Sequence, residues 1–176
     1  MDLRLAHTAD LDEATLGEAR ALLYSVFGDQ MVEEDWEHGL GGIHALAYED
    51  GRLVGHASVV QRRLLHAGRA LRTGYVEGVG VRADVRGRGY GSALMTELER
   101  IIRGAYALGA LSATDEGASF YAARGWQLWR GPTSALTPSG IVRTENDDDA
   151  IWVLPVDVPL DPTAELTADW REGTPW

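Results

Sequence analysis

The first candidate for chemistry in this sequence is a turn at 86–91, which reads RGRGYG. The turn follows an apolar run that ends at Val81 and precedes an amphipathic helical pattern. Where a strand feeds a glycine turn that opens a helix, small residues let the backbone approach a phosphate, and the N–H groups at the helix start point at it. The turn has neither the Gly-Lys-Ser/Thr ending of a Walker loop nor the spacing of a dinucleotide fingerprint. It therefore predicts another kind of phosphate cradle.

The strand before the turn carries a second candidate group, the sequence EGVGV at 77–81. Two glycines in a strand often mark a bulge or a close backbone approach. A bulge would turn the N–H of Val79 or of its neighbour toward a ligand; the alternative is that Gly78 and Gly80 only relieve crowding in the core. Glu77 lies in an otherwise apolar stretch. Its carboxylate could be a general base, directly or through water, or could hold a substrate ammonium group as an ion pair.

Composition narrows the possible partners. The chain of 176 residues has a formal net charge of −11 and no cysteine. The charge disfavours nucleic acid and anionic membranes and would attract a polycation, although Arg82, Arg86 and Arg88 imply a polyanionic ligand at the glycine turn. The lack of cysteine excludes disulfides and a cysteine nucleophile and suits a reducing cytoplasm. With no secretory signal and no apolar run near the ~20 residues that cross a bilayer, we expect a cytoplasmic protein.

Periodicity and turn signals predict the elements that position these groups. Helical patterns cover 10–27, 33–40, 89–103 and 115–124, strand patterns cover 3–7, 43–48, 53–65, 70–81, 106–112, 126–130 and 151–156, and 131–146 is a loop or irregular hairpin. Turns at 49–52 and 66–69 join strands into hairpins. This order predicts one α+β domain over 1–176, with a central mixed, mostly antiparallel, twisted sheet flanked by helices. The tail 157–176 carries Leu166, Trp170 and Trp176, so we expect it to pack back on the substrate site.

The glycine turn matches the Arg-x-x-Gly-x-Gly element of the GNAT acetyltransferases, and the phrase from Tyr121 to Gly125 and Trp126 resembles their Tyr-x-x-x-Gly-aromatic pattern. Segments over nearly the whole chain also resemble the aminoglycoside 2'-N-acetyltransferases of mycobacteria: 35–38, 40–42, 60–64, 74–79, 103–106, 108–112, 131–134 and 169–176. The resemblance implies a GNAT fold and direct acetyl transfer from acetyl-CoA to a 2'-amino group, with a homodimer as the common assembly.

The resemblance also implies roles for residues at matching positions. Glu77, or the terminal carboxylate of Trp176 through water, would deprotonate the amine, the N–H of Val79 would stabilise the oxyanion, and Tyr121 would protonate the departing thiolate. Acetyl-CoA would contact Val79, Gly80, Val81, Arg86, Gly87, Arg88, Gly89, Tyr90 and Gly91. The antibiotic would contact Asp35, Glu77, Gly78, Ser112, Asp147 and Trp176.

Several residues also have structural interpretations. By spacing alone Tyr121 would be a core aromatic residue, and Trp36 could flank the substrate or belong to the core. The remaining indoles, those of Trp126, Trp129 and Trp152, are expected in the core or on a sheet face. No metal is expected, because the histidines lack the spacing of metal ligands and are read as structural or surface residues. These histidines are His38, His44, His56 and His66.

Two positions depart from the family pattern, and they allow more than one class of substrate. Thr174 and Gln30 stand where the family has acidic residues. Fewer carboxylates favour a less charged aminocyclitol such as kasugamycin, or a narrower set of 2'-amino aminoglycosides. The alternatives are an acetyltransferase for another amine, such as a polyamine, a cell-wall precursor or a protein N-terminus, and a non-catalytic protein that binds acetyl-CoA or an antibiotic.

Overall fold

The computed structural model describes the backbone of residues 1–176 and every side chain except that of Asp115. Contacts divide the chain into two compact units. The first unit comprises Met1–Val60 and Val76–Ile101, and the second comprises Gln61–Tyr75 and Ile102–Trp176. Two strands, β3 (Arg52–His66) and β4 (Arg69–Val81), and the helix α3 (Tyr90–Ala105) contribute residues to both units. One domain over 1–176 stays a prediction.

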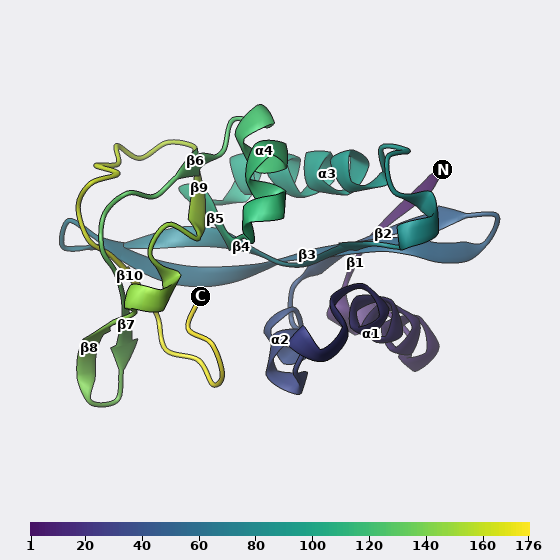
Figure 1. Cartoon of the computed structure of the whole chain (residues 1–176), viewed down its shortest axis with the longest axis horizontal. Helices are drawn as coiled ribbons and strands as arrows, with labels where there is room; N and C mark the ends of the chain where they lie inside the picture. Colours follow the sequence, from purple (N-terminus) through teal and green to yellow (C-terminus); the bar gives the residue numbers. More distant parts are fainter. The chain divides into compact units, whose positions relative to one another are not determined.

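The first unit is built on antiparallel strands with helices on both faces (Figure 1). Its strand β2 (Ile43–Glu49) pairs with β1 (Asp2–His7) on one side and with β3 on the other. The helices α1 (Glu13–Phe27) and α2 (Glu33–His38) lie on one face of these strands, and α3 lies on the other. The predicted hairpin at 49–52 is confirmed, because Asp50 (φ 50°) and Gly51 (φ 79°) both adopt the positive φ that a tight two-residue turn needs.

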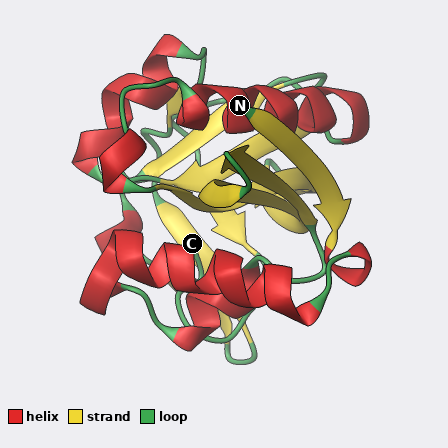
Figure 2. Cartoon of the chain, turned by 90° about the vertical axis from the view of Figure 1, so that its right-hand side faces the viewer, coloured by secondary structure: helices red, strands yellow, loops and turns green.

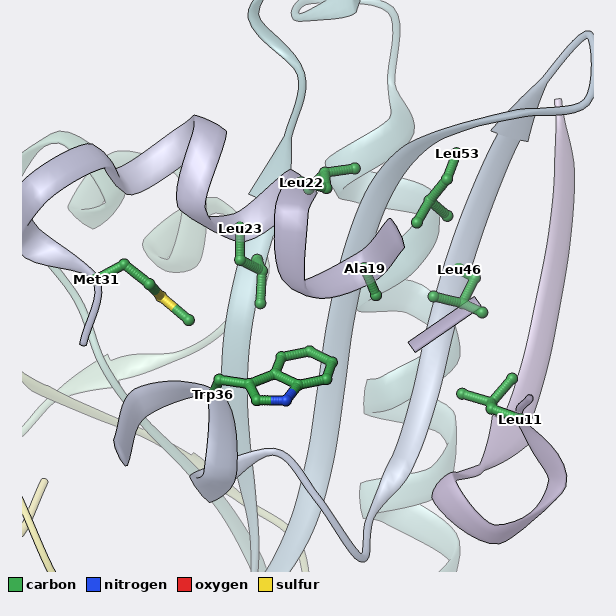
Figure 3. Packing of buried hydrophobic residues seen from close by; sticks show 8 residues of the cluster. All are labelled: Leu11, Ala19, Leu22, Leu23, Met31, Trp36, Leu46 and Leu53. Carbon is green, nitrogen blue, oxygen red and sulfur yellow. The ribbon is translucent and has the colours of Figure 1, made fainter. Parts of the chain in front are cut away.

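An apolar cluster joins α1 and α2 to the strands of the first unit (Figure 3). The eight buried side chains of this cluster are Leu11, Ala19, Leu22, Leu23, Met31, Trp36, Leu46 and Leu53. Helix α1 begins after Asp12, whose side chain accepts a hydrogen bond from the Thr15 N–H at 2.8 Å, and it ends at Phe27, before the capping residue Gly28. The capping residue therefore places the start of the helix a few residues later than the apolar spacing predicted.

The second unit contains a mixed sheet in the order β6-β9-β5-β4-β3-β10-β7-β8. Its strands beyond β3 and β4 are β5 (Leu108–Ser112), β6 (Gln127–Leu128), β7 (Thr133–Thr137), β8 (Gly140–Arg143), β9 (Ile151–Pro155) and β10 (Leu166–Ala168). The β4–β5 and β7–β10 pairs are parallel, and the β3–β10, β5–β9, β6–β9 and β7–β8 pairs are antiparallel. The helix α4 (Asp115–Ala123) follows β5. Helices flank the strands, as Figure 2 shows, which is the α+β arrangement predicted.

The tail contributes a strand to this sheet. Thr167 of β10 lies opposite Leu65 of β3 on one side and opposite Ser134 of β7 on the other. Arg62, only 5% exposed, donates through Nε to Asp169 at 2.8 Å. The sequence did not predict that the tail adds a strand, and its packing on the substrate site stays a prediction.

Two predicted boundaries in the second unit need correction. The strand predicted at 126–130 shortens to Gln127–Leu128, because Trp126 and Trp129 donate their N–H groups to Tyr121 and Ile151 outside a regular ladder. The segment 131–146 contains the β7–β8 hairpin rather than only a loop. No helix in the described part of the chain has both the length and the apolar character needed to span a membrane.

Candidate active site

The end of β4 departs from regular strand geometry at Gly78, whose φ of +58° lies in the left-handed region. The Gly78 carbonyl accepts a hydrogen bond from His56 Nδ1 at 2.8 Å, and the preceding Glu77 carbonyl accepts one from Ser58 Oγ at 3.3 Å. Side chains of β3 therefore satisfy two consecutive carbonyls here, as expected where a strand leaves its ladder. Val79, whose N–H is the predicted oxyanion donor, is half-buried directly after this irregularity.

The two glycines beside Val79 also allow α1 to approach closely. A Cβ added at Gly78 or at Gly80 would lie 2.9 Å from a methyl carbon of Leu23. Both glycines therefore relieve crowding against Leu23 of α1. At Gly78 the positive φ adds a conformational requirement that only glycine meets without strain.

The glycine turn has the geometry of an anion cradle. Gly87 (φ 76°) and Gly89 (φ 89°) have positive φ, and an added Cβ would meet nothing within 4 Å at either position. Conformation rather than crowding thus requires glycine here, and the turn is open to a ligand. α3 begins directly afterwards at Tyr90, so the first-turn N–H groups lack intrahelical acceptors and carry the positive end of the helix dipole. These features fit a pyrophosphate group.

The arginines of the turn are engaged by the protein itself. The Tyr90 hydroxyl donates to Glu49 Oε1 at 2.6 Å, and Arg88 donates to the same oxygen at 3.1 Å; these two donors hold the pKa of Glu49 below its usual value. Arg86 donates through Nε to the Val81 carbonyl at 3.2 Å. These contacts use one nitrogen of each guanidinium, so both arginines and the backbone N–H groups of the turn have donors that can meet an anion. The sequence missed Glu49 because it is the first residue of the predicted turn at 49–52 and only the fold brings it to the start of α3.

The other predicted residues of the first unit have distinct environments. Asp35 accepts a hydrogen bond from the Val32 N–H at 3.1 Å and so caps the start of α2. Trp36 is only 7% exposed and lies within the apolar cluster of Figure 3, which favours its structural interpretation. Glu77 is half-buried on β4, next to the irregularity.

Tyr121 is the predicted acid of the second unit. It is 8% exposed on α4, and its ring contacts those of Phe120 and Trp126 at centroid distances of 5.2 and 6.1 Å. Burial raises the pKa of Tyr121 to about 12, because the phenolate would lose its hydration. The hydroxyl is therefore protonated near neutral pH and able to donate a proton.

The C-terminal residue is anchored through Thr144. The Trp176 indole is 5% exposed, and its Nε1–H donates to Thr144 Oγ1 at 2.9 Å. The Thr144 carbonyl accepts from the Asp147 N–H at 2.8 Å, and burial raises the pKa of Asp147. Two predicted substrate residues, Asp147 and Trp176, thus share one threonine in the second unit. Ser112, also predicted to contact substrate, lies exposed at the end of β5.

The segment that carries Asp147 is fixed by an ion pair beside it. Asp148 accepts hydrogen bonds from the N–H and hydroxyl of Thr133 at 2.9 and 2.8 Å, and from Arg143 at 2.7 Å. The Arg143 guanidinium and these donors lower the pKa of Asp148 to about 2. The predicted site residues therefore form two groups: 35–36, 77–81 and 86–91 in the first unit, and Ser112, Tyr121, Asp147 and Trp176 in the second.

Comparisons with known proteins agree with this geometry. Residues 7–129 match the model of the acetyltransferase (GNAT) domain. An aminoglycoside 2'-N-acetyltransferase of Mycolicibacterium fortuitum is 51% identical over 177 residues, covering 98% of this chain and 91% of the relative.

Two solved structures share the fold. A GNAT family N-acetyltransferase of Escherichia coli, solved with CoA, has a TM-score of 0.65 at 17% identity and covers 95% of this chain and 88% of its own. Eis1 of Mycobacterium abscessus has a TM-score of 0.63 at 20% identity over 76% of this chain, and this chain spans 34% of its length. These likenesses confirm the predicted GNAT fold.

Proposed function

Because the chain belongs to the GNAT acetyltransferase family, we propose that it transfers the acetyl group of acetyl-CoA to the 2'-amino group of an aminoglycoside-type antibiotic. The observation that carries the proposal is the relative with that activity, which matches nearly the whole chain at 51% identity. The open glycine cradle at the start of α3 supports the use of a CoA thioester. A cytoplasmic location and a homodimer stay predictions.

The proposed mechanism assigns cosubstrate binding to backbone groups. The N–H groups of the turn 86–91 and of the first turn of α3 hold the pyrophosphate. The N–H of Val79 donates to the acetyl carbonyl oxygen and stabilises the negative charge that develops there. Acetyl-CoA supplies the activated acyl group.

Side chains then move the protons. Glu77, or the Trp176 carboxylate through a water molecule, removes a proton from the substrate ammonium group, and the free amine attacks the acetyl carbon. Tyr121 gives its proton to the departing thiolate; its pKa of about 12 keeps it protonated until then. The chain has no cysteine, so acetyl is passed directly to the amine rather than through an enzyme thioester.

The proposed preference of the enzyme for a polyamine substrate comes from carboxylates, which attract ammonium groups. Asp35, Glu77, Asp147 and the terminal carboxylate of Trp176 would contact substrate ammonium groups, with Gly78 and Ser112 as polar neighbours. Thr174 and Gln30 lower the number of carboxylates relative to the family pattern. This observation favours one second candidate, acetylation of a less charged aminocyclitol such as kasugamycin.

The test is CoA release from acetyl-CoA, followed with a thiol reagent, against matched amines. The panel pairs 2'-amino aminoglycosides with their 2'-hydroxyl counterparts and adds kasugamycin and spermine. We expect turnover only with the 2'-amino compounds. Turnover with kasugamycin alone would establish the second candidate, turnover with spermine alone would indicate another polyamine substrate, and binding of acetyl-CoA without thiol release would contradict an enzymatic function.

A further inference from the structure

A buried chain of hydrogen bonds runs through the first unit and ends at the irregular segment of β4. Thr8 Oγ1 lies 2.8 Å from His44 Nε2, His44 Nδ1 lies 2.9 Å from His56 Nε2, and His56 Nδ1 lies 2.8 Å from the Gly78 carbonyl. His44 and His56 are 0% and 1% exposed. These four residues, which we call the histidine relay, lie on neighbouring segments of the first unit.

The chemistry of the groups allows only one direction for the relay. A carbonyl oxygen can only accept, so His56 Nδ1 must carry the proton. Both histidines are neutral near pH 7, because burial lowers the pKa of each to about 4. With one proton per ring, His56 Nε2 accepts from His44 Nδ1–H, and His44 Nε2 accepts from the Thr8 hydroxyl. The hydroxyl oxygen of Thr8 lies 2.8 Å from His44 Nε2 and 3.3 Å from its other acceptor, the Gly42 carbonyl, so the shorter contact is the one to His44. The Gly41 N–H donates to Thr8 Oγ1 at 2.8 Å and completes the series.

Every donor in the relay therefore points toward the Gly78 carbonyl. That carbonyl and the Val79 N–H are the two ends of a single, resonance-stabilised peptide group. A hydrogen bond to the oxygen draws electron density from the nitrogen and makes the N–H a stronger donor, and successive hydrogen bonds polarise one another.

We propose that Thr8, His44 and His56 are positioning residues that orient and polarise the Gly78–Val79 peptide group, so that the Val79 N–H binds the developing oxyanion more strongly. This inference rests on the proposed function, in which Val79 is the oxyanion donor. Trp36 supports the arrangement, since its ring centroid lies 6.3 and 6.2 Å from those of His44 and His56 and shields the relay.

The kinetic experiment uses variants of His56 in the full chain. His56→Leu removes the donor to Gly78, whereas His56→Asn places an amide N–H near the position of Nδ1 and keeps it. Loss of a complete oxyanion donor costs 10²–10³ in kcat, so a weakened donor should lower kcat by about 10-fold in His56→Leu. We expect the KM for acetyl-CoA to stay within about twofold of the wild-type value. His56→Asn should recover most of the lost kcat, because it restores the hydrogen bond to Gly78; the recovery is incomplete because the rest of the series is not restored.

His66→Leu is the matched control. His66 is also buried, but its nitrogens contact the Glu165 carbonyl and the Asp161 N–H rather than Gly78. We expect this control to lower stability while leaving kcat unchanged. If the wild type is active and His56→Leu has the same kcat, the proposal is overturned. It is also overturned if His66→Leu loses as much kcat as His56→Leu.

Nuclear magnetic resonance tests the relay without any substrate. We expect the ring nitrogens of His56 to show the Nδ1–H tautomer, and the Val79 amide proton to shift upfield in His56→Leu but not in His66→Leu. The Nε2–H tautomer, or an unmoved Val79 resonance in His56→Leu, would overturn the relay whatever the activity. A wild type inactive toward every amine, with the predicted tautomer and shift, would instead contradict only the proposed function.

Discussion

Two short segments carry proposed functional groups, and the protein fixes them by opposite electrostatic means. In the first unit, neutral and fully buried histidines hold the Gly78–Val79 peptide group. In the second, the charged and partly exposed pair of Arg143 and Asp148 holds the segment that includes Asp147. A buried neutral chain avoids the cost of desolvating an ion, whereas an exposed ion pair keeps its hydration and adds little beyond its hydrogen bonds. The interactions that hold the two segments should therefore be lost under different conditions.

The largest expected effect is a loss of stability in acid, caused by the two buried histidines of the first segment. The folded pKa values of His44 and His56, about 4, lie below the unfolded value of 6.5, because of burial and, for His44, the charge of His7. The unfolded chain then binds more protons between these values, so stability is complete above pH 6.5 and falls as the pH drops toward 4. Between pH 7 and 5 we expect the free energy of unfolding to decrease by about 2 kcal/mol per histidine.

Urea denaturation at a series of pH values measures this decrease. The double variant His44→Gln with His56→Asn should lose most of the dependence between pH 7 and 5. An unchanged slope in that variant would mean that other groups cause it.

The next largest effect concerns the proposed acid of the second unit. Tyr121→Phe keeps the ring and its contacts with Phe120 and Trp126 but removes the hydroxyl. Since general acid catalysis contributes 10²–10⁴-fold, we expect kcat to fall about 100-fold. Steady-state kinetics should show little change in KM, and thermal unfolding should shift only slightly. Full turnover in this variant would remove Tyr121 as the acid.

Breaking the charged pair should cost less. Asp148→Asn weakens the acceptor for Thr133 and Arg143, and we expect about 1 kcal/mol of lost stability, because solvent screens a pair that is a third exposed. The lowered pKa of Asp148 contributes stability above the unfolded value of 3.8, and that contribution disappears as the pH falls toward about 2. Denaturation curves should therefore differ between variant and wild type at pH 6 and converge near pH 2. A constant difference across this range would contradict the assignment.

The smallest expected effect is on substrate preference. Thr174→Asp restores a carboxylate near the anchored Trp176 in the sequence, and we expect KM for the most highly charged aminoglycosides to fall about threefold. Thr174→Asn is the uncharged control. An equal change in both variants would exclude charge as the cause.

Sequence patterns predicted the structural features that depend on residues adjacent in the chain. The Asp-Gly pair at 50–51 predicted its turn, and the glycines of 86–91 predicted a cradle whose positive φ values agree with it. The histidine relay could not be predicted from the sequence, because His44 and His56 are 12 residues apart and are brought into contact only by the register of the strands. His44 lies opposite Ser58 and Leu46 opposite His56, so the two histidines are diagonal neighbours on one face. In the same way, no sequence signal joined Arg88 to Glu49 or identified the tail strand's partners.

The position of β10 has a consequence for how the second unit is made. This strand lies between β3 and β7, and Arg62 binds Asp169 across 107 residues of chain. Pairings of such separation close late, because the entropy of a long loop must be overcome before they form. During synthesis, β3 and β7 would emerge with their inner edges open, and open edges invite pairing with other chains. Because β10 follows both β3 and β7 in the chain, these edges stay open until β10 has been synthesised and pairs between them.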